Sequence, residues 1–513
     1  MHFTSWEFLL FFLPLTIAGF HMIPVHAALG RKLFLIAASL VFYAWFSIWC
    51  ALLLMVSMVV NHSLAEWVGN QAGRKRHWHV AMTGIGANLL LLFHFKYSNM
   101  FRESIGSLIG VSVDLPPLIL PLAISFYTFT QIGYLIDVAR TPRVRCGFID
   151  YCLFVVFFPH LIAGPVVRHS EMVPQFATRL LKPDWACMAS GAAIFMIGLY
   201  KKTLLADPAG AHADWIFGQV SEGQVLSWFS AWIGAFAYGL QIYFDFSGYS
   251  DMAIGLAVMF AIGFPSNFES PYKALNISDF WKRWHMSLTR FFRDYLYIPL
   301  GGNRDGRWLQ ARNILLVFLI SGLWHGAGWT FVVWGALHGF YLVTHLSWRN
   351  LMSFLGCNPR GWLWSVFAWG VTMAAVMFAW VFFRAPDVSS ALKISHAMLG
   401  FDGLSIPHRW AAWLEPLPFF GEIISGVGLP NPQIGWFWMC MHLFVLMGIA
   451  TFMPNSRQLI VPQHRYDLGN IPLEPHTSSR LSVIHGFAAG ILFAAFLYSK
   501  FSAAPSPFIY YNF

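Results

Sequence analysis

The stretch SGLWHGAGWTFVVWGALHG, residues 321–339, places histidines in a segment that is otherwise apolar or small. It belongs to the uncharged run 313–348, which would be about 54 Å long as one straight helix. The hydrocarbon core of a bilayer is only about 30 Å thick. The run must therefore tilt strongly or break, and the glycines of GLWHGAG are where the backbone relaxes most easily.

This arrangement would place His325 well inside the membrane, because it lies about 20 Å along the helix axis from Arg312. Backbone groups that a break frees at that depth must line a cavity or bond to other protein groups. A lone buried histidine is more often a core residue bonded to a backbone carbonyl, so depth alone does not make His325 functional. We interpret His338, farther along the same run, as structural and close to an interface.

The composition indicates an all-α polytopic membrane protein. Of the 513 residues, 57% are hydrophobic and only 11% are charged, whereas a soluble protein carries about a quarter charged residues. Apolar runs extend from end to end, so we expect one membrane-embedded domain over residues 1–513. Arginines and lysines in the loops give the net charge of +9. The positive-inside rule and contact with anionic membrane lipid explain these basic residues, so a nucleic-acid partner is not required.

The apolar runs give the candidate spans. The first carries Glu7 and has no basic residues ahead of it, which indicates a retained span rather than a cleaved signal peptide. The second is too long for one crossing, and a bend near 45–49 would return its basic flanks to the same side. The most loop-like stretches are 139–147, 205–222, 265–312, 384–434 and 454–480. The expected spans are 5–27, 33–65, 79–97, 113–136, 150–167, 186–204, 225–247, 252–264, 313–348, 362–383, 435–453 and 481–499.

The sequence carries no signature of a bound cofactor or metal. A G-x-G-x-x-G pattern, a P-loop and zinc-ligand spacing are all missing. The 6 cysteines show no C-x-x-C pair, so we expect small buried side chains rather than a metal cluster.

Residues 279–304 read DFWKRWHMSLTRFFRDYLYIPLGGNR and predict an amphipathic helix. Aromatic and apolar side chains share one face with His285, and basic side chains populate the other. One interpretation is an interfacial helix that binds anionic lipid. In a second, compatible one, the helix caps a cavity into which His285 points, and the basic residues receive the phosphates of a donor. Those basic residues are Lys282, Arg283, Arg290 and Arg293.

Carboxylates inside the apolar runs form the next candidate group. Asp245 and Asp251 lie in GLQIYFDFSGYSDMAIGLA, and a carboxylate at membrane depth must face a cavity or pair with a cation. We favour a structural pair with an arginine of 279–304 over a role in orienting a histidine. His160 and Arg168 bracket the Gly-Pro step of FFPHLIAGPVVRHS, which predicts a re-entrant turn of structural importance.

Taken together, these stretches resemble the membrane-bound O-acyltransferase family, above all its bacterial branch of alginate O-acetyltransferases and teichoic-acid D-alanyl transfer proteins. The likeness runs over most of the chain in the expected order, except for 386–434. By this resemblance His325 is the catalytic histidine, His285 is the second signature position, and the fold is a ring of tilted, broken helices around a central tunnel. The matching stretches are LPLAISFYTFTQIGYLID (120–137), FFPHLIAGPVVR (157–168), QIYFDFSGYSDMAIGLA (241–257), NFESPYKALNISDFWKRWHMSLTRFFRDYLYIPLGGNR (267–304), SGLWHGAGWTFVVWGALHG (321–339), WVFFRA (380–385) and MPNSRQ (453–458).

Acyl transfer from a thioester to a hydroxyl needs a base for the hydroxyl proton, donors for the oxyanion and the exclusion of water. A neutral imidazole suits the first task, so we hypothesise that His325 is the general base. Trp324 and Trp329 would exclude water, and backbone N–H groups of 326–328 are candidate oxyanion donors. His285 would position the donor or the acceptor, or share the proton.

The resemblance implies a multi-pass enzyme of the bacterial inner membrane, with a catalytic core over about 115–345. It would use a cytoplasmic thioester, acetyl-CoA by family precedent, for O-acetylation of an exported polysaccharide such as alginate or cellulose. A periplasmic acetyltransferase would complete the transfer, and 386–434 would lie on the membrane surface or face that partner. The alternatives are D-alanyl transfer to teichoic acid from a carrier-protein thioester, and a transporter with a His/Asp proton path. The matching branch disfavours a lipid or sterol acyltransferase.

Overall fold

The computed structural model shows a chain built almost wholly of helices. The described residues are 1–71, 76–110, 118, 120–178, 185–357, 359–407, 410, 424–427, 435–460 and 508. They fall into two compact units, each assembled from separate segments. Unit 1 comprises Met1–Tyr200, Ser247–Asn267 and Ser456–Phe513, and unit 2 comprises Lys201–Phe246 and Phe268–Asn455. The single domain expected over the whole chain stays a prediction.

Unit 1 confirms the bend expected near 45–49. Helix α2 ends at Ala44 and α3 begins at Ile48. Between them Ser47 is extended, and its hydroxyl accepts the backbone N–H of Cys50 at 3.4 Å, which caps α3. The helices of unit 1, in chain order, are η1 (Glu7–Phe12), α1 (Leu13–Met22), α2 (Ala28–Ala44), α3 (Ile48–Asn70), α4 (Arg76–Leu92), η2 (Phe93–Tyr97), α5 (Ser98–Ile109), α6 (Ile124–Arg140), η3 (Pro142–Val144), α7 (Phe148–Val156), α8 (Phe158–Leu161), α9 (His169–Thr178), α10 (Trp185–Tyr200) and α21 (Ser456–Ile460).

Unit 2 holds the elements that carry both signature histidines. Its helix α12 has 32 residues and continues past Phe246 into unit 1, so the spans expected at 225–247 and 252–264 are one helix. The elements are η4 (Lys201–Ala206), α11 (Asp207–Ser221), α12 (Trp228–Met259), η5 (Pro271–Lys273), α13 (Ile277–Arg283), α14 (Met286–Phe292), η6 (Arg293–Tyr297), α15 (Arg307–His325), α16 (Trp329–Phe354), α17 (Trp362–Arg384), α18 (Val388–Met398), β1 (Leu404–Pro407), β2 (Ile424–Val427) and α20 (Trp436–Phe452).

Three described helices are long and apolar enough to cross a membrane: Ile48–Asn70, His77–Ile109 and Trp362–Arg384. Glu7–Met22 and Trp436–Phe452 are shorter apolar helices. Large exposed apolar side chains are frequent on these elements, as expected for surfaces in contact with lipid. The last expected span, 481–499, lies outside the described residues.

Three sequence expectations were wrong about local structure. Residues 279–304 do not form one amphipathic helix, because α13, α14 and η6 divide the segment. The stretch 205–222, expected to be a loop, is mostly α11, which begins with a proline in its first turn. The stretch 384–434 contains α18, where the Asp387 side chain accepts the Ser390 N–H at 2.8 Å and caps the helix. It also contains a short parallel pairing of β1 with β2, while most of its remainder lies outside the described residues.

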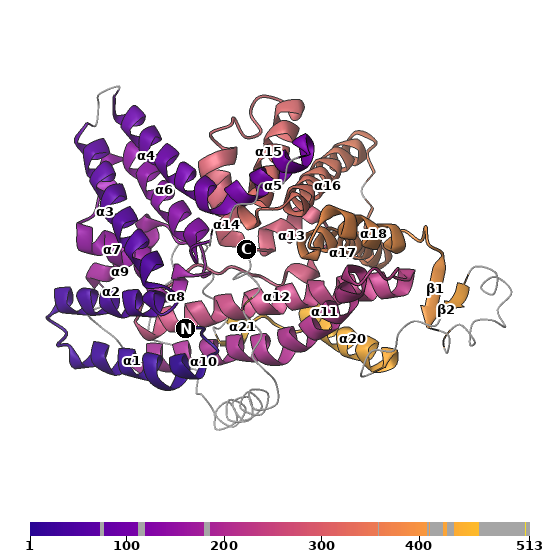
Figure 1. Ribbon diagram of the computed structural model, residues 1–513, viewed down its shortest axis with the longest axis horizontal. Helices are drawn as coiled ribbons and strands as arrows, with labels where there is room; N and C mark the ends of the chain where they lie inside the picture. Colours follow the sequence, from indigo (N-terminus) through magenta and orange to yellow (C-terminus); the bar gives the residue numbers. More distant parts are fainter. Residues whose placement is uncertain are drawn as a thin grey trace. The chain divides into compact units, whose positions relative to one another are not determined.

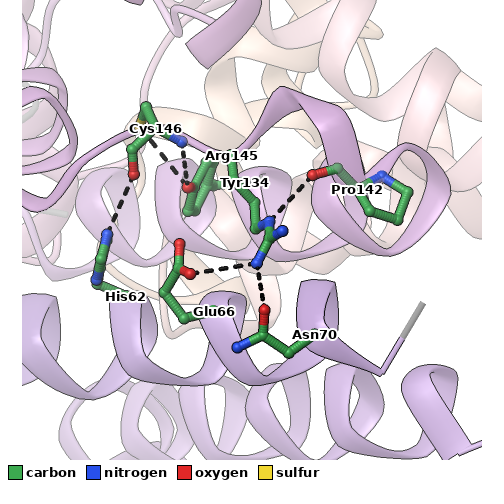
Figure 2. A network of polar contacts seen from close by, with 7 residues as sticks. All are labelled: His62, Glu66, Asn70, Tyr134, Pro142, Arg145 and Cys146. Carbon is green, nitrogen blue, oxygen red and sulfur yellow. Dashed lines mark hydrogen bonds and ion pairs between the residues drawn. The ribbon is translucent and has the colours of Figure 1, made fainter.

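A polar clamp holds the loop before α7 against α3 in unit 1 (Figure 2). The Arg145 guanidinium donates to the Glu66 carboxylate at 3.2 Å and to the Asn70 side-chain oxygen at 2.8 Å. The carbonyl oxygen of Cys146 lies 3.2 Å from His62 Nε2. These contacts satisfy polar groups at the end of an apolar helix and fix the connection from α6 to α7.

Helices α15 and α16 lie side by side in unit 2, with their backbones almost in contact (Figure 1). The gap at 326–328 confirms the break expected in the glycine-rich stretch. A Cβ at Gly322 would lie 2.2 Å from the carbonyl oxygen of Phe331, and a Cβ at Gly335 would lie 2.3 Å from that of Phe318. Because both obstacles are backbone atoms, no side-chain movement makes room for a larger residue.

We therefore expect Gly335→Ala to force the two helices apart and to lower the free energy of unfolding by about 1–3 kcal/mol. The matched control is Gly370→Ala in α17, where the added Cβ would meet nothing within 4 Å and where alanine is the better helix former by about 1 kcal/mol. Thermal unfolding of the detergent-purified variants measures the difference. Equal melting temperatures for both variants would contradict the close-contact argument.

Candidate active site

His325 is the last residue of α15, and its side chain is only 3% exposed. The helix ends there because Gly326 is extended, with φ −160° and ψ 152°. A Cβ on Gly326 would collide with the ring of Phe331, so a larger residue here would require that ring to move. The break predicted from the sequence therefore holds the imidazole at a helix end inside the packed interior of unit 2.

Aromatic rings enclose the imidazole of His325. Its ring centroid lies 4.9 Å from that of Trp324, 5.0 Å from that of Trp334 and 5.2 Å from that of Phe383. All three rings meet it edge to face, which surrounds the histidine with apolar surface. Trp329, expected to exclude water together with Trp324, is instead 53% exposed.

His285 lies between α13 and α14 in the left-handed backbone region, with φ 44° and ψ 51°. A residue with a Cβ pays about 1–3 kcal/mol for this conformation, and such strain is concentrated at functional sites. The side chain is 1% exposed, and Phe246 meets its ring edge-on at 4.6 Å. Burial lowers the pKa of His285 to about 3, so its ring is uncharged at neutral pH.

The fold of unit 2 brings the two signature histidines together. The ring centroids of His285 and His325 lie 6.4 Å apart, and Trp324 is close to both rings. At this separation the two imidazoles are near enough to act on the same substrate group. The pair is therefore a candidate site for proton transfer in a buried, largely apolar environment.

His338 does not belong to this pair. The ring of Trp334 stands between the two histidines, with its centroid 5.0 Å from that of His325 and 5.0 Å from that of His338. Trp281 and Tyr341 also contact His338, at 5.0 Å and 5.7 Å. Within the described part of the chain, neither ring nitrogen of His338 has a hydrogen-bond partner. The residue packs as a core ring, in keeping with the structural role that we assigned to it.

The two candidate carboxylates have different surroundings. Asp245 lies in unit 2, where the Lys202 ammonium is 2.7 Å from its Oδ1 and 2.6 Å from Oδ1 of Asp207. We expected an arginine as its partner, and this was wrong, because a lysine of η4 fills that position. Asp251 falls in unit 1 and accepts a hydrogen bond from the Ser456 hydroxyl at 2.6 Å. Neighbouring motifs in the sequence thus contribute to separate units.

The basic residues expected to meet donor phosphates surround the turn that carries His285. Arg283 and Arg293 are each paired with a nearby aspartate, at 2.9 Å and 2.7 Å. Lys282 is exposed and Arg290 is partly buried. They give this segment a basic outer surface while the histidine faces the interior.

Two parts of this arrangement were missed from the sequence. Lys202 follows an apolar run, and a lysine at such a position is typical of a membrane interface. The one local indication that Lys202 forms an ion pair is Asp207, five positions later. Phe383 belongs to the WVFFRA stretch, but nothing in that motif indicates a contact with His325. Among the described residues, no group of three or more His, Cys, Asp or Glu side chains could hold a metal ion.

Comparison with known proteins assigns the chain to a family. The sequence model of the membrane-bound O-acyltransferase family matches residues 138–383, which include both signature histidines. A protein named peptidoglycan O-acetyltransferase, from Helicobacter pylori, is 39% identical over 99% of this chain and 96% of its own length. The chain belongs to the membrane-bound O-acyltransferase family. It is therefore an O-acyltransferase and a membrane protein, as the sequence predicted.

Other relatives place this O-acyltransferase within its family. A probable alginate O-acetylase from Azotobacter vinelandii is 37% identical over 100% of both chains. A teichoic acid D-alanyltransferase from Bacillus subtilis is 27% identical over 44% of this chain and 58% of its own length. The resemblance noted from the motifs is confirmed, whereas the ring of helices around a tunnel stays a prediction.

We expect Lys202→Met to destabilise the enzyme by about 3–5 kcal/mol, because it leaves two carboxylates without their buried cation. Asp245→Asn should cost less, since Lys202 keeps Asp207, and the double variant should recover part of the loss. Membrane abundance and melting temperature measure the order of the three variants. If Lys202→Met proved as stable as the wild type, the pair would not contribute to stability.

Proposed function

We propose that this enzyme transfers acetyl groups from acetyl-CoA, on the cytoplasmic side of the bacterial inner membrane, for O-acetylation of an exported polysaccharide. The observation that carries the proposal is the buried pair of His285 and His325, 6.4 Å apart. Relatives that match over nearly the whole chain are named as acetylating enzymes. An uncharged imidazole enclosed by aromatic rings is suited to accept a hydroxyl proton where water is excluded.

In the proposed reaction, His325 takes the proton of the acceptor hydroxyl while the hydroxyl oxygen attacks the thioester carbonyl carbon. The new C–O bond forms as the C–S bond breaks, and the proton passes from His325 to the departing thiolate, so charge and protons balance. The aromatic rings around His325 limit hydrolysis of the thioester. His285 positions the donor or the acceptor, and backbone N–H groups of 326–328 are candidates to stabilise the oxyanion.

The basic surface near His285 supports a donor that carries phosphates. Guanidinium and ammonium groups bind phosphate through charge-assisted hydrogen bonds, and Coenzyme A presents several phosphates. We assign this role to Lys282, Arg283, Arg290 and Arg293. Segments rich in arginine and lysine favour the cytoplasmic side of a membrane, where they also contact anionic lipid. The donor would therefore approach the basic residues near His285 from the cytoplasm.

The acceptor class is taken from the relatives. The names of the Helicobacter pylori and Azotobacter vinelandii relatives specify a glycan, peptidoglycan in one case and alginate in the other. We propose an exported glycan as the final acceptor, with a periplasmic acetyltransferase completing the transfer as the family resemblance implies.

D-alanyl transfer to teichoic acid is a second candidate, supported by the Bacillus subtilis relative over 44% of this chain. A transporter with a His/Asp proton path is disfavoured by the Lys202 ammonium, which neutralises Asp245 at 2.7 Å. Purified protein with labelled acetyl-CoA separates these functions. The proposed enzyme releases CoA, a D-alanyl transferase requires a carrier-protein thioester instead, and a transporter consumes neither.

His325→Ala is expected to slow acetyl transfer by about 10²–10⁴-fold, the usual contribution of a general base. The matched control is His338→Phe, which replaces one ring by another in the same aromatic cluster and should keep most of the activity. CoA release by purified protein, at equal membrane abundance, is the measurement. Full activity of His325→Ala would remove this residue from the mechanism.

A test of His285 needs a variant that removes the imidazole and keeps the left-handed backbone conformation. Asparagine tolerates the left-handed region better than alanine does, so His285→Asn should keep the fold while removing the imidazole. His285→Ala should be less stable than His285→Asn, because alanine lacks the short polar side chain that makes the left-handed region accessible to asparagine. We expect His285→Asn to melt near the wild-type temperature but to turn over slowly. Wild-type turnover in this variant would reduce His285 to a structural residue.

A further inference from the structure

The walls of the histidine site come from three consecutive helices of unit 2. The ring of His325, at the end of α15, is met by Trp334 of α16 at 5.0 Å and by Phe383 of α17 at 5.2 Å, measured between ring centroids. Trp324 meets the same imidazole at 4.9 Å. Aromatic rings in edge-to-face contact have centroids about 4.5–7 Å apart, so these rings touch the imidazole.

These spacings limit what can stand beside the imidazole. Carbon atoms in contact are about 3.5–4.0 Å apart, so a carbon atom held between two rings needs their centroids at least about 7–8 Å apart. The spacings of 4.9 Å, 5.0 Å and 5.2 Å are well below this value. The separation of 6.4 Å between the rings of His325 and His285 comes nearest to it. A carbonyl carbon that reacts at His325 therefore enters most easily on the side of His285.

Phe383 is wedged in place from behind. Its side chain is 1% exposed, and its ring centroid lies 5.0 Å from that of Phe331, 5.1 Å from that of Trp334 and 5.3 Å from that of Trp380. Phe331 in turn lies against the backbone at Gly326, because a Cβ on that glycine would collide with its ring. Protein interiors are close-packed, so a ring supported in this way can retreat from the imidazole only if its neighbours also move.

The wall residues differ in how they are tied to the histidines. Trp324 and Trp334 belong to the hairpin of α15 and α16 that positions His325, and Trp324 also lies close to His285. Phe383 belongs to α17, so its size can change while the glycine contacts that close the hairpin stay in place. Phe383 is therefore the wall residue best placed to set the space beside the imidazole without setting the position of the imidazole.

We propose that Phe383 is a specificity-determining residue that limits the transferred acyl group to acetyl. The alkyl end of the acyl group is turned toward the Phe383 ring, where a methyl group fits and each further methylene must displace a supported ring. Overfilling a packed apolar site is unfavourable, and one methylene in a hydrophobic pocket changes kcat/KM by about 10–200-fold. This inference rests on the proposed function and adds to it the residue that selects the acyl group of the donor.

The test compares CoA release from acetyl-CoA, propionyl-CoA and butyryl-CoA by the purified full-length protein. The donors share the same CoA head, so contacts with that head cancel when their kcat/KM values are divided. The ratio is also independent of the fraction of the enzyme that is folded. For the wild type we expect kcat/KM to fall at least about tenfold from acetyl-CoA to propionyl-CoA, and to fall further for butyryl-CoA.

Phe383→Leu removes part of the wall and should raise the ratio of kcat/KM for butyryl-CoA to that for acetyl-CoA by at least about tenfold. The matched control is Phe382→Leu, the same change one position earlier in α17. The ring of Phe382 is also buried, and its centroid lies 6.0 Å from that of Phe378. This control should leave the ratio close to the wild-type value.

Phe331→Leu is a second variant that tests the same wall from behind. It removes the ring that supports Phe383 at 5.0 Å. Phe383 can then yield to a longer acyl group, so the ratio should rise, although by less than in Phe383→Leu. This variant keeps the inference open to contradiction if Phe383→Leu does not fold.

Equal kcat/KM for the three donors in the wild type would overturn the inference without any variant. So would an unchanged ratio in Phe383→Leu or, should that variant not fold, in Phe331→Leu. An equal rise in Phe382→Leu would also overturn it, because general loosening of α17 would then explain the change. In each of these cases CoA release from acetyl-CoA leaves the proposed function standing, whereas release from none of the three donors overturns both.

Discussion

The contact between the backbones of α15 and α16 is the constraint on which the site depends. Gly322 and Gly335 let the two helices approach until carbonyl oxygens occupy the space where a Cβ would stand. The hairpin can then close over the three residues 326–328, so that α15 ends at the imidazole of His325. A wider hairpin would move the histidine away from the rings of α16 and α17 that now enclose it.

Helix α12 links the charged interior of unit 2 to this uncharged site. Asp245 is fixed by the Lys202 ammonium at 2.7 Å, and the next residue, Phe246, meets the ring of His285 at 4.6 Å. The ion pair thus orients the helix that presents an apolar wall to the histidine. The Lys202 ammonium lies between the Asp207 and Asp245 carboxylates, while aromatic rings contact both imidazoles.

Membership in the membrane-bound O-acyltransferase family gives these features a chemical context. A base that accepts a hydroxyl proton needs an uncharged ring, and a thioester needs protection from water. In the proposed reaction, burial of His325 among aromatic rings would serve both needs.

The sequence by itself determined the helical membrane class, the bend near 45–49 and the break at 326–328, because helix length and glycine content are properties of contiguous residues. The roles that the family resemblance implies for His285 and His325 stay predictions. It did not determine the left-handed turn at His285, which interrupts a segment whose periodicity favours one helix. Nor did it indicate that Lys202 rather than an arginine neutralises Asp245, or that Phe383 meets His325. Those contacts join segments far apart in the chain, and only tertiary packing decides which side chains meet. A buried charge needs a partner of opposite charge, but the sequence does not specify which residue that partner is.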